Sequence, residues 1–405
     1  MSGRIAVVGA GMAAARLAQQ LAERGRGDEV TLYGVEPHRP YNRTLLADVL
    51  TGRLDAAAVT LPCGAPGTAV RTGCEVLGLD VRSRTLTLAG GGQAGYDELV
   101  LATGANPVLP PIRGLRTADG GLKAGVHAFR SLVDCARLAE GAARASRAVV
   151  IGGGVLGVSA ARALAAVGLP TEIVHQAPYL IERHLDEGAG GALRGALEAL
   201  GVHTYPGNRA RALDGDLRVT GVRLATGYVL DADLVVLACG VRPRTGLAHT
   251  AGIPVRDGVV VDDRLATGAP HVFAIGDCAE HAGVTHGLAG PAWDQADVLA
   301  ARLCGAGPDT VYQGSRPLVR LTAGPLEYAA FGETGEADGT DVLRVADATR
   351  GPYGSYKKLV LRGDRLVGGI LLGDLATVGD LTRAYERDEA LPEDPLHLLT
   401  TEGAA

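Results

Sequence analysis

The sequence is poor in aromatic side chains and in lysine. Only 4% of its 405 residues are aromatic, and lysine occurs only as Lys123, Lys357 and Lys358. The net charge of −6 argues against non-specific binding to nucleic acid or to a membrane surface. No apolar run approaches the ~20 residues of a membrane-spanning helix, and the chain starts almost directly with its first predicted strand, so we expect no signal peptide.

The cysteines are scattered and form no motif. No two of them make a C-x-x-C pair, and no group has the spacing of zinc or iron–sulfur ligands. We therefore expect no metal site and free thiols in a reducing cytosol. The six are Cys63, Cys74, Cys135, Cys239, Cys278 and Cys304.

What the sequence does contain is a pair of glycine-rich fingerprints. The first is Gly9-Ala10-Gly11-Met12-Ala13-Ala14, and the second is Gly152-Gly153-Gly154-Val155-Leu156-Gly157. Each follows a short apolar run and precedes a stretch with helical periodicity, which is the context of a dinucleotide-binding unit. The glycines permit a tight turn, and the helix N-terminus attracts a pyrophosphate. One such motif is a weak signal, but two predict two dinucleotides, most economically FAD and a nicotinamide dinucleotide.

Several residues that could contact these cofactors follow predicted strands. Glu36 follows the second predicted strand, where a carboxylate can accept the ribose hydroxyls of an adenosine. The stretches 96–105 and 231–240 each contain an apolar predicted strand that ends in a small-residue turn, Thr103-Gly104 in the first and Cys239-Gly240 in the second. This internal repeat has one copy for each fingerprint. Glycines in such turns can leave the strand with positive φ and lie close to a cofactor.

Other candidate residues are less decisive. Asp277 ends a strand and places a carboxylate where a ribityl chain could lie. His175 stands where an acid would mark NAD, and it either bonds a ribose or is a solvated histidine. Trp293 either stacks near a flavin or anchors a helix start. Arg183 either clamps a phosphate or lies on the surface, and Tyr356-Lys357-Lys358 is either a docking patch for an acidic partner or a solvated strand end.

Three stretches are more specific than the fingerprints. Residues 36–52, 173–190 and 356–374 resemble the N-terminal flavin module of the large subunit of NADH-dependent nitrite reductases, whose relatives are the rubredoxin and ferredoxin reductases. Taken with both fingerprints, essentially the whole chain resembles the FAD-dependent pyridine nucleotide oxidoreductases.

The resemblance implies an α/β fold with two Rossmann-like nucleotide-binding domains and a C-terminal α+β interface domain. Residues 1–117 and 241–311 would form an FAD-binding domain that is split in the sequence. Residues 118–240 would form an inserted NAD(P)-binding domain. The last segment, 312–405, alternates strand-like runs with Gly/Asp turns and would form the third domain.

The resemblance also implies which residues meet each cofactor. FAD would be met by Gly9, Gly11, Ala14, Glu36, Arg43, Thr103, Gly104 and Asp277, with Trp293 as a further candidate. The nicotinamide coenzyme would be met by Gly152, Gly154 and Gly157, with His175 and Gly240 as further candidates. Because no arginine follows His175 directly, we expect NADH to be preferred over NADPH.

The sequence departs from the families that it resembles in three ways that bear on the chemistry. Residues 41–50, where disulfide reductases of this kind carry a redox cysteine, contain none, which excludes a thiol–disulfide relay there. The chain also lacks cysteine sets for iron–sulfur or sirohaem centres, so it can at most pass electrons on. Many relatives carry a lysine–glutamate pair beside the flavin, and here Asp48 and Ser159 occupy these two positions.

The sequence therefore predicts a cytoplasmic NAD(P)H-dependent FAD oxidoreductase that passes electrons to a separate partner of the nitrite reductase, rubredoxin or ferredoxin type. Two alternatives stay open. One is a stand-alone flavoenzyme that acts on a small molecule or on oxygen. The other is a flavin-binding subunit or sensor with degraded turnover, which Asp48 and Ser159 suggest. The sequence specifies neither the electron acceptor nor the oligomeric state.

Overall fold

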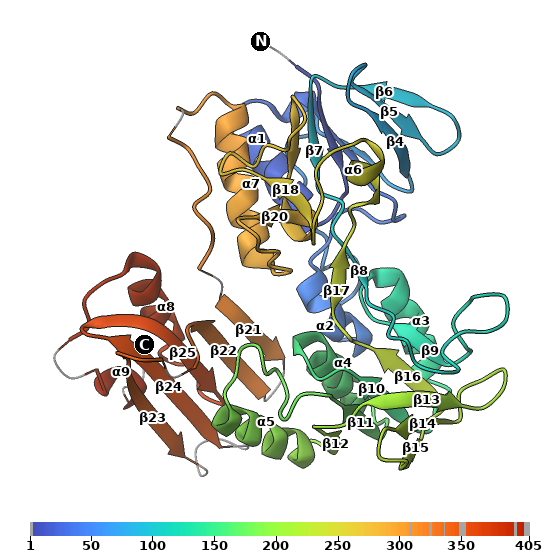
Figure 1. Ribbon diagram of the computed structural model, residues 1–405, viewed down its shortest axis with the longest axis vertical. Coiled ribbons are helices and arrows are strands. Elements are labelled where there is room, and N and C mark those ends of the chain that lie inside the picture. The colour runs from blue at the N-terminus through green and yellow to red at the C-terminus, as the bar shows by residue number, and fades with distance from the viewer. Residues whose placement is uncertain are drawn as a thin grey trace. The chain divides into compact units, whose positions relative to one another are not determined.

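The computed structural model describes residues 3–307, 309–316, 318–323, 326–335, 337–347, 354–392 and 395–400. The chain divides into two compact units, which are described separately (Figure 1). Unit 1 comprises Met1–Leu45, Asp55–Asn106 and Val241–Ser315, and unit 2 comprises Leu46–Leu54, Pro107–Gly240 and Arg316–Ala405. The three domain boundaries expected from the sequence stay a prediction.

Unit 1 is built on a five-stranded parallel sheet with the order β19-β7-β1-β2-β3. Its strands are β1 (Ile5–Val8), β2 (Val30–Tyr33), β3 (Ala69–Arg71), β7 (Glu98–Leu101) and β19 (Val272–Ala274). Every residue of β1 is buried, as expected for a central strand covered on both faces. Helices α1 (Met12–Glu23) and α7 (Ala289–Leu303) pack against each other (Figure 1). The first fingerprint thus lies after the central strand.

Smaller elements complete unit 1. An antiparallel three-stranded sheet contains β4 (Val76–Asp80), β5 (Thr85–Leu88) and β6 (Gln93–Gly95). Two strand pairs and one short helix follow: β8 (Ala105–Pro107) with β17 (Val241–Pro243), β18 (Val259–Val261) with β20 (Ala279–His281), and α6 (Gly246–Thr250).

Unit 2 contains a second five-stranded parallel sheet, with the order β12-β11-β10-β16-β9. Its strands are β9 (Val126–Ala128), β10 (Ala148–Ile151), β11 (Thr171–Val174), β12 (Val202–Tyr205) and β16 (Leu234–Leu237). Its helices are α2 (Leu46–Leu50), α3 (Leu132–Ala142), α4 (Val155–Ala166) and α5 (Glu187–Ala199). An antiparallel sheet of β13 (Ala210–Asp214), β14 (Gly221–Leu224) and β15 (Val229–Asp231) follows in the same unit. The second fingerprint strand, β10, is again central.

The C-terminal part of unit 2 is an antiparallel sheet with the order β21-β22-β25-β24-β23. It consists of β21 (Leu318–Ala323), β22 (Leu326–Gly332), β23 (Asp341–Asp347), β24 (Ser355–Arg362) and β25 (Arg365–Leu372), followed by α8 (Val378–Arg387) and α9 (His397–Thr400). Leu359, Leu371 and Leu381 are fully buried in its core. Helix α5 packs against β24 and β25 (Figure 1). The predicted fold class, two Rossmann-like sheets plus an α+β part, is confirmed.

One expectation about this part is wrong. Lys357 and Lys358 were expected on a docking patch or at a solvated strand end, but they are only 2% and 1% exposed. Lys357 Nζ lies 2.8 Å from Asp374 Oδ2, and Lys358 Nζ lies 2.9 Å from Asp186 Oδ2. Two carboxylates whose side chains are 10% and 20% exposed therefore compensate both charges, which the local sequence does not reveal.

Among the described residues, no helix is both long and apolar enough to cross a bilayer.

Candidate dinucleotide-binding sites

The two glycines of the first glycine turn, Gly9 and Gly11, have different roles: the fold requires a glycine at the first, whereas the second faces open space. Gly9 has φ +119°, and a Cβ there would lie 2.0 Å from the carbonyl oxygen of Ala102. Gly11 is the N-cap of α1, and a Cβ there would meet no described atom within 4 Å. Ala14 is fully buried, facing the strand side of α1. The backbone N–H groups that begin α1 thus border a cradle that a pyrophosphate would fit.

The second glycine turn has the same build. Gly152 has φ +111°, and a Cβ there would lie 2.2 Å from the carbonyl oxygen of Ala238. Gly154 is the N-cap of α4, and its Cβ position is open. A Cβ on Gly157 would lie 1.9 Å from the carbonyl oxygen of Gly152, so this glycine lets α4 approach the turn closely. Each fingerprint therefore leaves one open cradle at the carboxyl end of a central strand.

Two of the residues expected at FAD form one cluster with a third. Tyr41 Oη donates to Glu36 Oε2 at 2.7 Å, Arg43 Nη1 donates to Tyr41 Oη at 2.9 Å, and Arg43 Nη2 pairs with Glu36 Oε1. Burial acts to raise the pKa of Glu36, but the charge and hydrogen bond of Arg43 and the hydroxyl of Tyr41 outweigh burial and lower it. The charge of Asp277 also acts on Arg43. Unit 1 therefore gathers Glu36, Arg43 and Asp277 electrostatically, and Tyr41 is a member that the sequence analysis missed.

The remaining unit 1 candidates lie in two turns. The Thr103 hydroxyl donates to the carbonyl oxygen of Arg244 at 2.7 Å, and Gly104 has φ +71° with an open Cβ position. The Gly276 N–H, beside Asp277, donates at 2.7 Å to the side chain of Gln295 on α7. Gln295 is 2% exposed and was not predicted. The sequence pattern that could have predicted it is a glutamine on the otherwise apolar face of a predicted helix.

Two further candidates are more exposed. Trp293, on α7, is 38% exposed. Gly240 has φ +94° and an open Cβ position, as Gly104 does in the first unit. The internal repeat of the sequence is therefore a repeat of backbone conformation, in which a glycine follows each strand with positive φ.

His175 is buried between the second glycine turn and a carboxylate. Its Nδ1 accepts from the Gly153 N–H at 3.1 Å, and its Nε2 lies 2.9 Å from Glu182 Oε2. The side chain of His175 is 8% exposed and that of Glu182 is 33% exposed. His175 is therefore not a solvated histidine. Glu182 was missed by the sequence analysis because it is seven positions from the strand end where an acid is usually sought.

Asp48 and Ser159 both have partners close by. Asp48 is 7% exposed and its Oδ1 lies 2.7 Å from Nη2 of Arg53, while Ser159 Oγ donates to the Val155 carbonyl oxygen at 2.8 Å. Helix α2, which carries Asp48, packs on α4. Burial lowers the pKa of Arg162 on α4, the charge of Asp48 opposes that shift, and the charge of Arg53 adds to it. Asp48 thus pairs with Arg53 and acts electrostatically on Arg162, so its buried charge is compensated.

These features define a class of protein. Four strands of each parallel sheet have the same order around a central fingerprint strand, and each sheet has one open glycine cradle, which is the arrangement of a two-dinucleotide protein. The sequence profile described as pyridine nucleotide-disulphide oxidoreductase matches residues 3–296. The chain belongs to this family, whose members use FAD and NAD(P)H.

Several known proteins are similar over most of the chain. It is 36% identical over 395 residues to a nitrite reductase [NAD(P)H] of Bacillus subtilis, covering 96% of this chain and 48% of that protein. It is 34% identical over 376 residues to an assimilatory nitrate reductase electron transfer subunit of the same organism, covering 92% of this chain and 48% of that protein. The chain therefore spans about half the length of these relatives.

A solved structure is similar over nearly its full length. The ferredoxin reductase for the CYP199A2 system of Rhodopseudomonas palustris has 27% sequence identity and a TM-score of 0.83, covering 96% of this chain and 95% of that chain. The chain is also 33% identical over 279 residues to the biphenyl dioxygenase system ferredoxin–NAD(+) reductase component of Paraburkholderia xenovorans. The match covers 68% of this chain and 67% of that protein.

The family name includes a disulfide, but the cysteines here are free. All six are unpaired with one another. Burial raises the pKa of Cys135 and of Cys239 to about 11, so both thiols are protonated at neutral pH. Among the described residues, no group of three or more His, Cys, Asp or Glu side chains could hold a metal ion.

Proposed function

We propose that the chain is an electron-transfer reductase that binds FAD in the cradle of unit 1 and NAD(P)H in the cradle of unit 2, and that passes electrons to a separate redox protein. The observation that carries this proposal is the repeated cradle, with Gly11 and Gly154 open at the N-terminus of α1 and of α4. Bound FAD supplies the chemistry, because it accepts a hydride from the coenzyme and can release the electrons onward.

The residues of the chain would bind FAD and orient it. In our proposal Gly11 leaves room for the FAD pyrophosphate, Arg43 offsets its charge, Glu36 accepts from the adenosine ribose and Asp277 from the ribityl chain. The Glu36–Tyr41–Arg43 hydrogen bonds support this assignment, since they fix the orientations of these three side chains relative to one another. We assign Thr103, Gly104 and Trp293 to the same site. Hydride transfer needs no general base, and we assign none.

The coenzyme site is assigned in the same way. Gly154 would leave room for the coenzyme pyrophosphate, Gly152 and Gly157 would shape the turn, and Gly240 and His175 would lie at its border. The domain boundaries of the sequence analysis, 1–117 with 241–311, 118–240 and 312–405, are proposed with these sites.

The acceptor is proposed from the relatives. The names of the similar proteins include a nitrite reductase, an electron transfer subunit and a ferredoxin reductase component, which supports a partner with an iron–sulfur or haem centre. We also propose a cytoplasmic location, where NAD(P)H is available and free thiols persist; the free state of all six cysteines supports it.

The test begins with purified protein. We expect about one FAD per chain, fast anaerobic reduction of that FAD by NADH in a stopped-flow spectrometer, and reoxidation by a ferredoxin, a rubredoxin or a nitrite reductase haem domain. Reoxidation by oxygen or a small quinone alone would favour the stand-alone enzyme. Bound FAD that NADH does not reduce would favour the sensor and overturn the proposal.

A further inference from the structure

The segment after β11 folds back onto the second glycine turn. The N–H of Ile181 donates to the Gly153 carbonyl oxygen at 2.9 Å, and the Gly153 N–H donates to His175 Nδ1 at 3.1 Å. Both polar backbone groups of Gly153 therefore hold this segment. Ile181 has φ +55°, a conformation that β-branched residues rarely adopt. The turn that it makes brings Glu182, the next residue, back to His175.

The hydrogen bonds determine which atom of His175 carries the proton. Because Nδ1 accepts from a backbone N–H, the ring hydrogen lies on Nε2, which donates to Glu182 Oε2 at 2.9 Å. The imidazole is buried, whereas a third of the Glu182 side chain is exposed. A carboxylate has about four acceptor sites, so one bond to His175 leaves Glu182 able to accept from a ligand.

We propose that Glu182, positioned by His175, is the carboxylate that selects the coenzyme. It accepts hydrogen bonds from the hydroxyls of the adenosine ribose of NADH and repels the 2′-phosphate of NADPH. This inference rests on the proposed function, because it requires a nicotinamide coenzyme in unit 2. In dinucleotide folds the selecting acid lies at the carboxyl end of the second strand, beside the glycine turn. Here His175 occupies that position. Its hydrogen bond holds the carboxylate of Glu182, which is seven residues further along the chain, beside the glycine turn.

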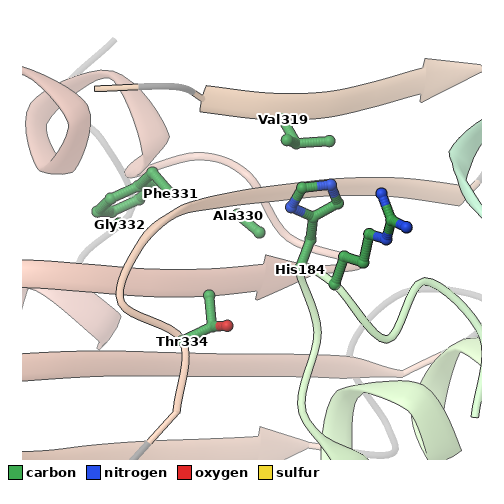
Figure 2. A pocket seen from close by; sticks show the side chains of 7 residues that line it. His184, Val319, Ala330, Phe331, Gly332 and Thr334 are labelled. Atoms are coloured by element: carbon green, nitrogen blue, oxygen red, sulfur yellow. The ribbon is translucent and has the colours of Figure 1, made fainter. Parts of the chain in front are cut away.

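The neighbouring arginine, Arg183, forms no ion pair with Glu182 in the described part of the chain. Arg183 lines a pocket together with His184 and with Val319, Ala330, Phe331, Gly332 and Thr334 of the C-terminal sheet (Figure 2). Burial lowers the pKa of His184, the charge of Arg183 lowers it further, and the charge of Glu182 opposes both effects. Arg183 therefore lies beside residues of β21 and β22, whereas Glu182 is the residue that contacts His175 next to the glycine turn.

The test uses two ligands that carry no nicotinamide, ADP-ribose and 2′-phospho-ADP-ribose, so that binding is measured without hydride transfer. Calorimetry on the full FAD-loaded protein should show at least a tenfold preference for ADP-ribose, which corresponds to about 1.4 kcal/mol. Glu182→Gln keeps the shape and removes the charge, so it should reduce that preference to about twofold or less. Glu182→Ala should do the same. The matched control is Glu187→Gln, an exposed glutamate at the start of α5, which should leave the preference unchanged.

To test whether His175 positions Glu182, the experiment must measure a quantity that a mere loss of packing at His175 would leave unchanged. That quantity is the preference for ADP-ribose over 2′-phospho-ADP-ribose. His175→Phe should shift the ligand preference in the same direction as Glu182→Gln, and the double variant should be no worse than either single one, because both changes remove the same carboxylate contact. Flavin absorbance and the unfolding midpoint verify that each variant is folded.

Three outcomes separate the hypotheses. A Glu182→Gln protein whose preference stays within twofold of wild type overturns this inference and leaves the reductase proposal intact. Loss of ADP-ribose binding in His175→Phe alone would assign the ribose to His175 and also overturn it. Wild-type protein that binds neither ligand would overturn the coenzyme site itself, together with the proposed function.

Discussion

Lys358 allows the sharpest test of what holds unit 2 together. It lies on β24 with its side chain 1% exposed, and its Nζ donates to Asp186 Oδ2 at 2.9 Å and to the Thr334 carbonyl oxygen at 2.8 Å. Tyr356 Oη donates to the same oxygen of Asp186 at 2.8 Å. Asp186 is also the N-cap of α5, where it accepts from the Ala189 N–H at 2.9 Å. One network therefore joins the C-terminal sheet to the N-terminus of α5.

The substitution Lys358→Met removes the charge and keeps most of the apolar stem. Removal of one partner of a buried pair costs about 3–5 kcal/mol, because the other charge stays buried. We expect about 3 kcal/mol, the low end of that range, because the Asp186 side chain is 20% exposed and keeps two other donors. At about 2–4 °C per kcal/mol for a unit of this size, the unfolding midpoint should fall by roughly 6–12 °C.

Calorimetry and near-ultraviolet circular dichroism on the FAD-loaded protein measure this change. The matched control is Arg194→Met on α5, whose Nε lies 2.8 Å from Glu198 Oε1 with side chains 54% and 44% exposed. An exposed pair of this spacing contributes only about 0.3–0.5 kcal/mol. If Lys358→Met costs no more than Arg194→Met, the buried network does not stabilise unit 2 and this reasoning is refuted.

The network also predicts a dependence on pH. Burial acts to raise the pKa of Asp186, but the hydrogen bonds from Ala189, Lys358 and Tyr356 and the charge of Lys358 outweigh burial and lower it. A carboxyl with a depressed folded-state pKa stabilises the protein above its unfolded pKa of about 3.9 and loses that contribution as the pH falls further. The stability difference between wild type and Lys358→Met should therefore be constant from about pH 5 to 8 and shrink below about pH 4.

Three further predictions concern the cofactor sites. Gly11→Val should abolish flavin retention while circular dichroism stays native, since its Cβ enters the open cradle; full flavin absorbance would contradict the site. Serine at Cys135 or Cys239 should leave NADH-to-dye electron transfer within a few-fold of wild type, because their thiols are protonated at neutral pH; loss of turnover with flavin still bound would place a thiol in the chemistry. Asp48→Asn should lower the free energy of unfolding by about 1–3 kcal/mol in urea titrations, because two arginines lose their counter-charge, and an unchanged midpoint would contradict that.

Local patterns sufficed to predict the two nucleotide-binding sheets. A glycine fingerprint between an apolar run and a helical stretch specifies strand, turn and helix within about twenty residues, and both βαβ units follow from it. The same pattern does not distinguish the glycines from one another. Gly9 and Gly11 are two positions apart, yet one is crowded by the Ala102 carbonyl and the other is open. That difference depends on a neighbouring strand, β7, which is distant in the sequence.

The buried pairs could not be predicted in this way. Lys358 and Asp186 are 172 positions apart, and the sequence suggested only a docking patch or a solvated strand end for the lysine. Only the packing of α5 on β24 and β25 makes them neighbours. Glu182 was missed for a more local reason, since it returns to His175 through the left-handed turn at Ile181, a residue type that gives no sign of such a turn.

The side chains around Asp48 change the interpretation of the missing lysine–glutamate pair. With Ser159 the sequence suggested a site that had lost a charge pair, and that was the only motive for a sensor with degraded turnover. The structure instead pairs Asp48 with Arg53 and brings its charge to bear on Arg162, one helical turn beyond Ser159 on α4. One carboxylate and two guanidiniums form a substitute network with a net positive charge. Arg162 keeps a buried Nη1 without a hydrogen-bond partner in the described part of the chain, so the network retains an unused donor.

A lysine at position 48 would place a third cation beside the two arginines. Restoring the relatives' pair should therefore require Arg162 to change together with Asp48 and Ser159, and the two-site substitution by itself should destabilise unit 2.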